Sequence, residues 1–499
     1  MNRTIFSNGL WNVLGGMSSA IVAVLVPPFL TRLLPPEAYG AWAIALQIGT
    51  YVNLFGMGVQ VAVGRYVAFH HQPEATAERD AIVASAFWCI LIAAIIGILI
   101  IGCVALNTDR LFPQLSPAWR ADSALATGLL GLSFGIGLLG SVFGSVFLGL
   151  QKSHVPAMTQ MVGRVAQAIL LIAAAQTRSL TIMAIAHLIG SIGICSVLMY
   201  LWSTRTTKPT IAPKLVSRKS LKALADFCVT LTVWNLAMLL VSGLDLIIIS
   251  RYDFGSVPYY AVSLTLVSFI TGTLQSMAGA LPPAAATMQS TGDQRQLHDL
   301  FLRSTSLMAV AALLVSAPLM FLGQGILHLW VGEVYADNAH RILALLAVAN
   351  VIRTCLLPYG MIAIGTGQQR RMLYTPLVEG VVSLALSLWW ATLYGAIGVA
   401  AAKIVSAAIG IALLLAQHAL SYTMPDLHRR EVAFAGMVRP AIFWLLLGGA
   451  VLLLGRLSGN ILVHYPAIAI VILAAAIAMG WRELGTAVDY LRSRKATHA

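Results

Sequence analysis

Five charged side chains interrupt long apolar segments of this 499-residue sequence, namely Arg164, Asp245, Arg353, Glu379 and Lys403. A charge at the centre of a lipid bilayer costs about 2.5 to 3.5 kcal/mol on insertion scales, so such a residue normally faces a polar cavity or a charged partner. The three cations could bind phosphate, which a guanidinium matches in bidentate geometry. The two carboxylates could take up a proton or Na⁺.

Two amides extend this set, because Gln167 and Asn350 each lie three residues from an arginine and so share its helical face. We expect a cationic cavity for the substrate. Its predicted lining residues are Arg353, Arg164, Lys403, Gln167 and Asn350. The strongest candidate is Arg353, since its mid-helix position leaves the side chain no route to either membrane surface.

Structural roles compete with these assignments. Arg164 and Glu379 occupy corresponding positions in two similar halves of the chain and could pair, and the long side chain of Lys403 could extend to the outer membrane surface. Asp245 or Glu379 could couple transport to an H⁺ or Na⁺ gradient, or Asp245 could pair with an arginine. No metal site or cofactor is expected, because the five cysteines stand singly in apolar segments without the close spacing of thiolate ligands.

Membrane-spanning helices must position these residues. Hydrophobic residues make up 59% of the chain and charged residues only 10%, against about 25% charged in soluble domains, which excludes a soluble enzyme. A bilayer core about 30 Å thick needs about 20 apolar residues per helix. Fourteen segments meet that requirement: 10–30, 41–67, 82–106, 124–148, 158–175, 181–202, 227–249, 260–281, 306–330, 342–364, 376–390, 396–416, 441–454 and 461–479.

The distribution of Lys and Arg predicts the orientation of these helices, because cytoplasmic loops hold the excess of basic residues. With the amino terminus inside, most of the 31 basic residues fall in cytoplasmic segments. We therefore expect both termini in the cytoplasm.

The chain also contains an internal repeat. Thr31-Arg32 ends the first predicted helix and Ser250-Arg251 ends the seventh, while Gly149-Leu150-Gln151 matches Gly367-Gln368-Gln369. A third match joins 161–165 to 377–381, and all three copies are offset by about 218 residues, so the halves have the same orientation.

The predicted fold is thus an all-α integral membrane protein with about 14 transmembrane helices. It consists of an N-terminal six-helix bundle (1–204), a basic cytoplasmic linker (205–221), a parallel C-terminal six-helix bundle (222–420), and two additional helices with a cytoplasmic tail (421–499). Pro27 and Pro28 are the predicted hinge, because adjacent prolines leave two carbonyls unpaired.

Several short motifs carry a family resemblance: Asn8-Gly9-Leu10-Trp11-Asn12, the turn at 30–40, Gly365-Thr366-Gly367-Gln368 with the following Glu379, and the turn at 394–400. With the two bundles and terminal helix pair, the chain resembles the lipid-linked oligosaccharide flippases of polysaccharide biosynthesis. These belong to the multidrug/oligosaccharidyl-lipid/polysaccharide flippase superfamily.

The resemblance implies translocation of an undecaprenyl-pyrophosphate-linked oligosaccharide repeat unit across the bacterial inner membrane, for exopolysaccharide, capsule or O-antigen synthesis. It also implies alternating access between the two halves. The expected partners are this polyprenyl-pyrophosphate substrate and membrane lipids, with polysaccharide polymerase and chain-length proteins as further candidates.

Two other functions stay open. A multidrug or organic-cation antiporter of the same fold would need an acidic pocket. A membrane polysaccharide polymerase would need paired carboxylates or a metal cluster near an outer loop, whereas Asp109, Asp122, Glu333 and Asp337 are scattered. Despite a net charge of +13, no basic run is interleaved with aromatic residues outside the membrane, so no nucleic acid is expected as a partner.

Overall fold

The computed structural model describes residues 20–69, 76–205, 211–279, 281–290, 292, 294–367 and 374–420, and this part of the chain contains helices but no strand. Contacts divide the chain into two compact units, an N-terminal unit (1–262) and a C-terminal unit (263–499).

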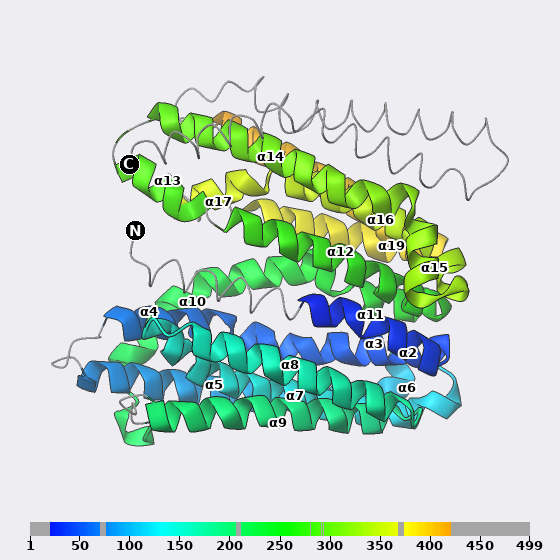
Figure 1. Ribbon diagram of the computed structural model, residues 1–499, viewed down its shortest axis with the longest axis horizontal. Coiled ribbons are helices and arrows are strands. Elements are labelled where there is room, and N and C mark those ends of the chain that lie inside the picture. Colours follow the sequence, from blue (N-terminus) through cyan, green and yellow to red (C-terminus); the bar gives the residue numbers. More distant parts are fainter. Residues whose placement is uncertain are drawn as a thin grey trace, which may run out of the picture. The chain divides into compact units, whose positions relative to one another are not determined.

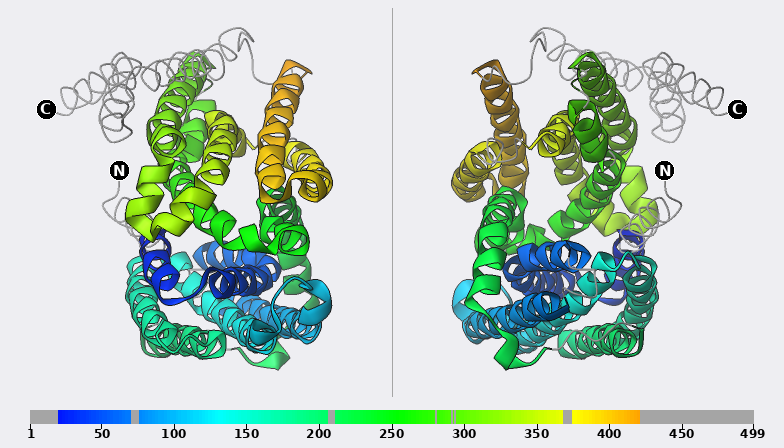
Figure 2. Two further views of the ribbon diagram at one scale, coloured as in Figure 1. Left: turned by 90° about the vertical axis from the view of Figure 1, so that its right-hand side faces the viewer. Right: turned by 90° about the vertical axis from the view of Figure 1, so that its left-hand side faces the viewer.

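The N-terminal unit is built around four long helices, α5, α7, α8 and α9, which run alongside one another (Figure 1) and are seen along their axes in Figure 2. Its described elements are α2 (Pro27–Leu33), α3 (Pro36–Thr50), η1 (Tyr51–Phe55), α4 (Met57–Phe69), α5 (Thr76–Leu106), α6 (Thr108–Leu111), α7 (Pro117–Gly149), α8 (His154–Ala175), α9 (Leu180–Arg205), η3 (Pro213–Leu215), α10 (Arg218–Met238), the π-helix η4 (Leu239–Gly243), α11 (Asp245–Tyr252) and η5 (Phe254–Ser256).

The C-terminal unit contains a second set of long apolar helices. Its described elements are most of α12 (Val257–Ala278), then α13 (Leu281–Ser290), α14 (Gln294–Phe321), α15 (Gly323–Val331), α16 (Glu333–Cys355), α17 (Leu357–Gly365) and α19 (Tyr374–Leu420). Within this unit α16 packs against α14, α15 and α19.

The all-α membrane class predicted from the sequence is confirmed. In the described ranges nine helices are long and apolar enough to cross a membrane, or ten when the bent pair 36–54 and 58–68 counts as one span. The two predicted spans at 441–454 and 461–479 lie outside the described residues, as does half of the first. The exact count of fourteen stays a prediction.

Some predicted spans differ in detail. The segments at 376–390 and 396–416 form one run, α19, which bends at Gly395. Gly395 has φ 57°, a left-handed conformation that glycine adopts at no steric cost. The segment at 227–249 is divided by the π-helix η4 between α10 and α11.

Helix α10 begins at Arg218, inside the predicted linker 205–221. Ser217 caps this helix, since its hydroxyl accepts a hydrogen bond from the backbone N–H of Ser220 at 3.0 Å. Because α10 packs on α4 and α5, it groups with the N-terminal unit, and the division after Val262 falls later in the chain than the predicted linker. The predicted domain boundaries stay a prediction.

The first described helix is interrupted at the predicted hinge. Residues 20–25 are helical, the helix is interrupted at Val26, whose backbone angles stay helical, and α2 begins at Pro27. The reason is that proline lacks the backbone N–H that would continue the helix. Pro358 similarly lies in the first turn of α17, after a break at Leu356.

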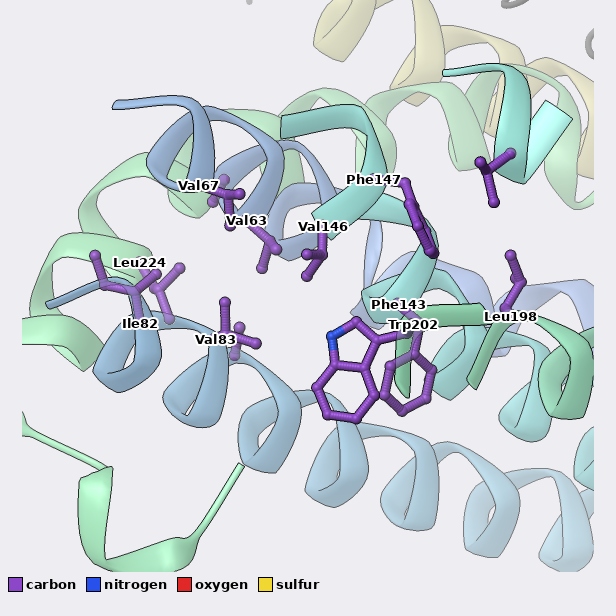
Figure 3. Packing of buried hydrophobic residues seen from close by; sticks show 13 residues of the cluster. Val63, Val67, Ile82, Val83, Phe143, Val146, Phe147, Leu198, Trp202 and Leu224 are labelled. Atoms are coloured by element: carbon purple, nitrogen blue, oxygen red, sulfur yellow. The ribbon is translucent and has the colours of Figure 1, made fainter. Parts of the chain in front are cut away.

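The core of the N-terminal unit is a cluster of buried aliphatic and aromatic side chains from α4, α5, α7, α8, α9 and α10 (Figure 3). The rings of Phe143 and Trp202 lie against each other with centroids 5.2 Å apart. This cluster fixes α7 against α9, the two helices that position the polar residues described next.

Candidate functional site

A polar cavity of about 300 Å³ lies inside the N-terminal unit. Its walls come from η1, α4, α7, α8 and α9, and most of its side chains carry amide, hydroxyl, imidazole or guanidinium groups. The lining residues are Asn53, Gln60, Ser133, Phe134, Gly137, Gly140, Ser141, Gln160, Arg164, Gln167, His187, Ser191, Ile194, Cys195 and Leu198. Polar groups that converge on one cavity in an apolar bundle indicate a site for a hydrophilic ligand.

Arg164 supplies the permanent charge of this cavity. Its Nε is buried and has no hydrogen-bond partner. Within the described ranges no hydrogen bond or ion pair reaches this side chain. Glu379, the partner predicted for Arg164 as an alternative, forms an ion pair with Arg353 in the C-terminal unit. A cation in a membrane-spanning helix needs compensation, and this one is available to an anionic ligand.

Four polar side chains form a buried network beside Arg164. The Oγ of Ser133 lies 2.7 Å from Nδ1 of His187 and 2.8 Å from Oγ of Ser191. The Nε2 of Gln167 donates to the backbone carbonyl of His187 at 2.7 Å and to Oγ of Ser191 at 3.2 Å. Gln167, a predicted substrate residue, thus lines the cavity while its amide hydrogens join α8 to α9.

Two glycines allow α8 and α9 to approach closely enough for this network. A Cβ at Gly190 would lie 2.6 Å from Cγ of Gln167, and one at Gly163 would lie 2.2 Å from Cγ1 of Ile194. Small residues at helix contacts are a usual means of close packing in membranes. The local sequence therefore places Gln167 and His187 within hydrogen-bond distance.

Arg353 and Glu379 form an ion pair inside the C-terminal unit. The Nη2 and Nε of Arg353 lie 2.7 Å and 2.8 Å from Oε1 of Glu379. The arginine side chain is 28% exposed and the glutamate side chain 11% exposed. A Cβ at Gly410 would lie 2.9 Å from Oε2 of Glu379, so the glycine makes room for the carboxylate.

The other two predicted cavity residues of the C-terminal unit are buried as well. The Nζ of Lys403, 3% exposed, donates to Oγ of Ser383 at 2.8 Å, so this lysine does not extend to the membrane surface. The Oδ1 of Asn350 accepts from Oγ1 of Thr271 at 2.7 Å, while its Nδ2 is buried without a partner.

Asp245, a predicted coupling residue, begins α11 directly after the π-helix and is 2% exposed. Its Oδ2 accepts a hydrogen bond from the hydroxyl of Tyr260 at 2.9 Å. Just before it, the carbonyl of Gly243 accepts hydrogen bonds from Nε2 of Gln47, at 3.1 Å, and from the hydroxyl of Tyr51. A π-helix is common at functional sites, and here it frees a carbonyl next to a buried carboxylate.

The structure therefore separates the predicted residues into groups. Arg164 and Gln167 share the N-terminal cavity, Arg353 pairs with Glu379, and Lys403 contacts Ser383. The sequence analysis missed His187, Ser133 and Ser191, which stand singly in apolar segments. A useful signal would have been the spacing of His187 and Ser191, four residues apart on one helical face.

Apolar helices here enclose charged and polar side chains, an arrangement typical of the class of membrane transport proteins. Residues 29–340 match a family model described as "Polysaccharide biosynthesis protein". The chain therefore belongs to the polysaccharide biosynthesis protein family, which confirms the class predicted from the sequence.

The chain is also similar to individual proteins and solved structures. A protein of Shigella flexneri named "Putative O-antigen transporter" is 23% identical over 151 residues, which span 30% of this chain and 35% of that protein. Among solved structures, the lipid II flippase MurJ in its inward closed conformation has a TM-score of 0.74 at 14% identity, covering 96% of this chain and 99% of that one. An inward-facing multidrug resistance transporter of the MATE family and the MOP superfamily has a TM-score of 0.59 at 18% identity, covering 83% and 96%. At these identities the structures show the shared fold.

Proposed function

We propose that this protein translocates an undecaprenyl-pyrophosphate-linked oligosaccharide repeat unit across the bacterial inner membrane, by alternating access through a cationic cavity. The family match, and the names of the Shigella flexneri and MurJ relatives, support a lipid-linked glycan as the substrate. Such a unit would serve exopolysaccharide, capsule or O-antigen synthesis.

The observation that carries this proposal is Arg164, a guanidinium without a partner among the described residues that faces a polar cavity of about 300 Å³. A pyrophosphate or acidic sugar that leaves the headgroup layer loses its hydration, and only a cation or polar donors can compensate for that loss. Arg164 supplies both charge and a forked donor geometry. The roles proposed for Arg353 and Lys403 are weaker, because each already has a partner inside the protein. Asn350 has only its buried Nδ2 to offer, since its Oδ1 already accepts a hydrogen bond from Thr271.

A second candidate function is export of organic cations, which the MATE-like fold would allow. Such a substrate would be repelled by Arg164 and would need an acidic site, for which the buried Asp245 is the candidate. Asp245, like Glu379, is also the candidate for coupling to an H⁺ or Na⁺ gradient. The cavity lining favours the anionic substrate.

The experiment uses cells that depend on this protein for surface polysaccharide. Arg164→Gln should lower surface polysaccharide and raise the cytoplasmic pool of lipid-linked glycan, while Arg110→Gln, an exposed outer arginine, should leave both unchanged. Dye efflux measured in the same cells tests the exporter. If dye efflux depends on the protein and the Arg164→Gln variant exports glycan normally, the protein is an exporter of organic cations and the proposed function is wrong.

A further inference from the structure

His187 is a titratable group in the same cavity as Arg164. It is 7% exposed, comes from α9, and lines the cavity together with Arg164 from α8. The two side chains are close enough for their charges to interact. From α7 the groups that face the ring are the Ser133 hydroxyl and the Phe134 ring, whose centroid lies 5.3 Å from that of His187.

The other charged groups of the surrounding elements lie toward helix ends. Arg65 lies in the second half of α4, Arg120 and Asp122 stand in the first turns of α7, and His154 begins α8. Arg205 ends α9, and Arg32 lies in the last turn of α2, which packs on α8. Cys195, on α9 itself, is the further titratable group in the cavity lining. Arg164 is therefore the charge that His187 meets inside the cavity.

The hydrogen-bond network can hold His187 in either protonation state without moving a heavy atom. A serine hydroxyl both donates and accepts, so Ser133 can donate to an unprotonated Nδ1 or accept from a protonated one and donate on to Ser191. In the protonated state Nδ1 is bound to Ser133, so the second N–H, on Nε2, is left to bind a ligand.

We propose that this cavity binds an oxyanion between Arg164 and His187, and that His187 takes up a proton when the anion binds. In the empty cavity a charged His187 would be repelled by Arg164. An anion placed between them reverses that balance, since each cation then has an opposite charge beside it. By linkage, anion binding and protonation must strengthen each other equally.

The chemical class of the ligand follows from the lining. A volume of about 300 Å³ is at the small end of ligand pockets and suits one phosphoryl group or one acidic sugar. The amides of Asn53, Gln60 and Gln160 can bind hydroxyl or ester oxygens beside the charge. The ligand is therefore a hydrophilic oxyanion, either the phosphate of the carrier lipid or the carboxylate of a sugar. Its assignment to the transported substrate rests on the proposed function, whereas the site itself does not.

The test is calorimetric titration of the purified full-length protein in detergent, with dimethyl phosphate and glucuronate as separate probes, because both stay singly charged anions between about pH 5 and pH 8. Each titration is repeated in two buffers of different ionisation enthalpy, which reveals proton uptake. For the wild type we expect binding that strengthens as the pH falls from about 8 to about 5, the range in which histidine titrates. The heat should also depend on the buffer.

The variants separate the two roles. Arg164→Gln should weaken binding by about tenfold or more, the effect of losing a hydrogen bond to a charged group. His187→Gln can keep a hydrogen bond to Ser133 and should retain weaker binding whose heat no longer depends on the buffer. The matched controls are Arg110→Gln and His154→Gln, both exposed in the structure, which should behave as the wild type.

Each outcome decides one point. Binding of dimethyl phosphate alone assigns the site to the phosphate, and binding of glucuronate alone assigns it to a sugar. Absence of binding by the wild type for both probes, or equal proton uptake by the wild type and by His187→Gln, would overturn the proposal. If the oxyanion proposal fails in this way but cells still export glycan, the proposed function is unaffected. If the purified protein binds the probes but cells export no glycan, the proposed function is wrong and the oxyanion site remains.

Discussion

At the level of single residues, the Arg353–Glu379 ion pair should contribute to the stability of the folded protein. Glu379→Ala leaves the guanidinium of Arg353 without its carboxylate, and breaking a buried pair in this way costs about 3 kcal/mol, at the lower end because Arg353 is 28% exposed. The double variant Arg353→Ala with Glu379→Ala should recover most of that loss, since no unpaired charge is left. Thermal unfolding in detergent measures both. Equal stability of Glu379→Ala and the wild type would mean that the pair contributes nothing.

The same pair tests the substrate role predicted for Arg353. We expect Arg353→Ala to reduce glycan export, and Arg353→Lys to restore it only in part, because a fork of donors becomes a point charge. Export is measured in cells as surface polysaccharide, at equal protein abundance. If the double variant with Glu379→Ala exports normally, Arg353 serves only to neutralise Glu379, and its substrate role is wrong.

At the level of secondary-structure elements, breaks in the helices are the candidate sites of bending during transport. The interruption at Val26, before Pro27 and Pro28, is the predicted hinge of the N-terminal unit. Pro27→Ala with Pro28→Ala restores backbone donors and should continue the helix through this point. We expect export to fall while the melting temperature is unchanged or higher, measured on the same purified protein. Normal export would show that the break is not needed for transport.

Sequence alone predicted most elements but not all of their breaks. Apolar segments of fixed length identify membrane helices because the bilayer sets that length. The π-helix at Leu239–Gly243 could not be predicted, because the groups that bind the Gly243 carbonyl, Gln47 and Tyr51, are distant in the sequence. The network of His187 likewise needs side chains from α7, α8 and α9, and a lone histidine in an apolar segment gives little sign of it.

Orientation is the property of the whole molecule that the basic residues predict. Reporters fused after Lys208 and at Ala499 should read cytoplasmic, and one inserted near Thr108 should read periplasmic, because basic loops stay on the cytoplasmic side. Alkaline phosphatase activity measures each position. A periplasmic reading at Ala499 would imply an odd number of helices and would contradict the predicted fourteen.

In the proposed mechanism, Arg164 is the cation that binds a lipid-linked glycan inside the N-terminal unit. The decisive measurement is the translocation rate of a fluorescent polyprenyl-pyrophosphate-linked glycan in liposomes that contain the purified protein. We predict translocation by the wild type and by Arg110→Gln, and a rate lower by about tenfold or more for Arg164→Gln, which loses the charged donor. Folding of that variant should be intact, because no described residue loses a partner. An Arg164→Gln protein that translocates the glycan at the wild-type rate would contradict the proposed role of Arg164.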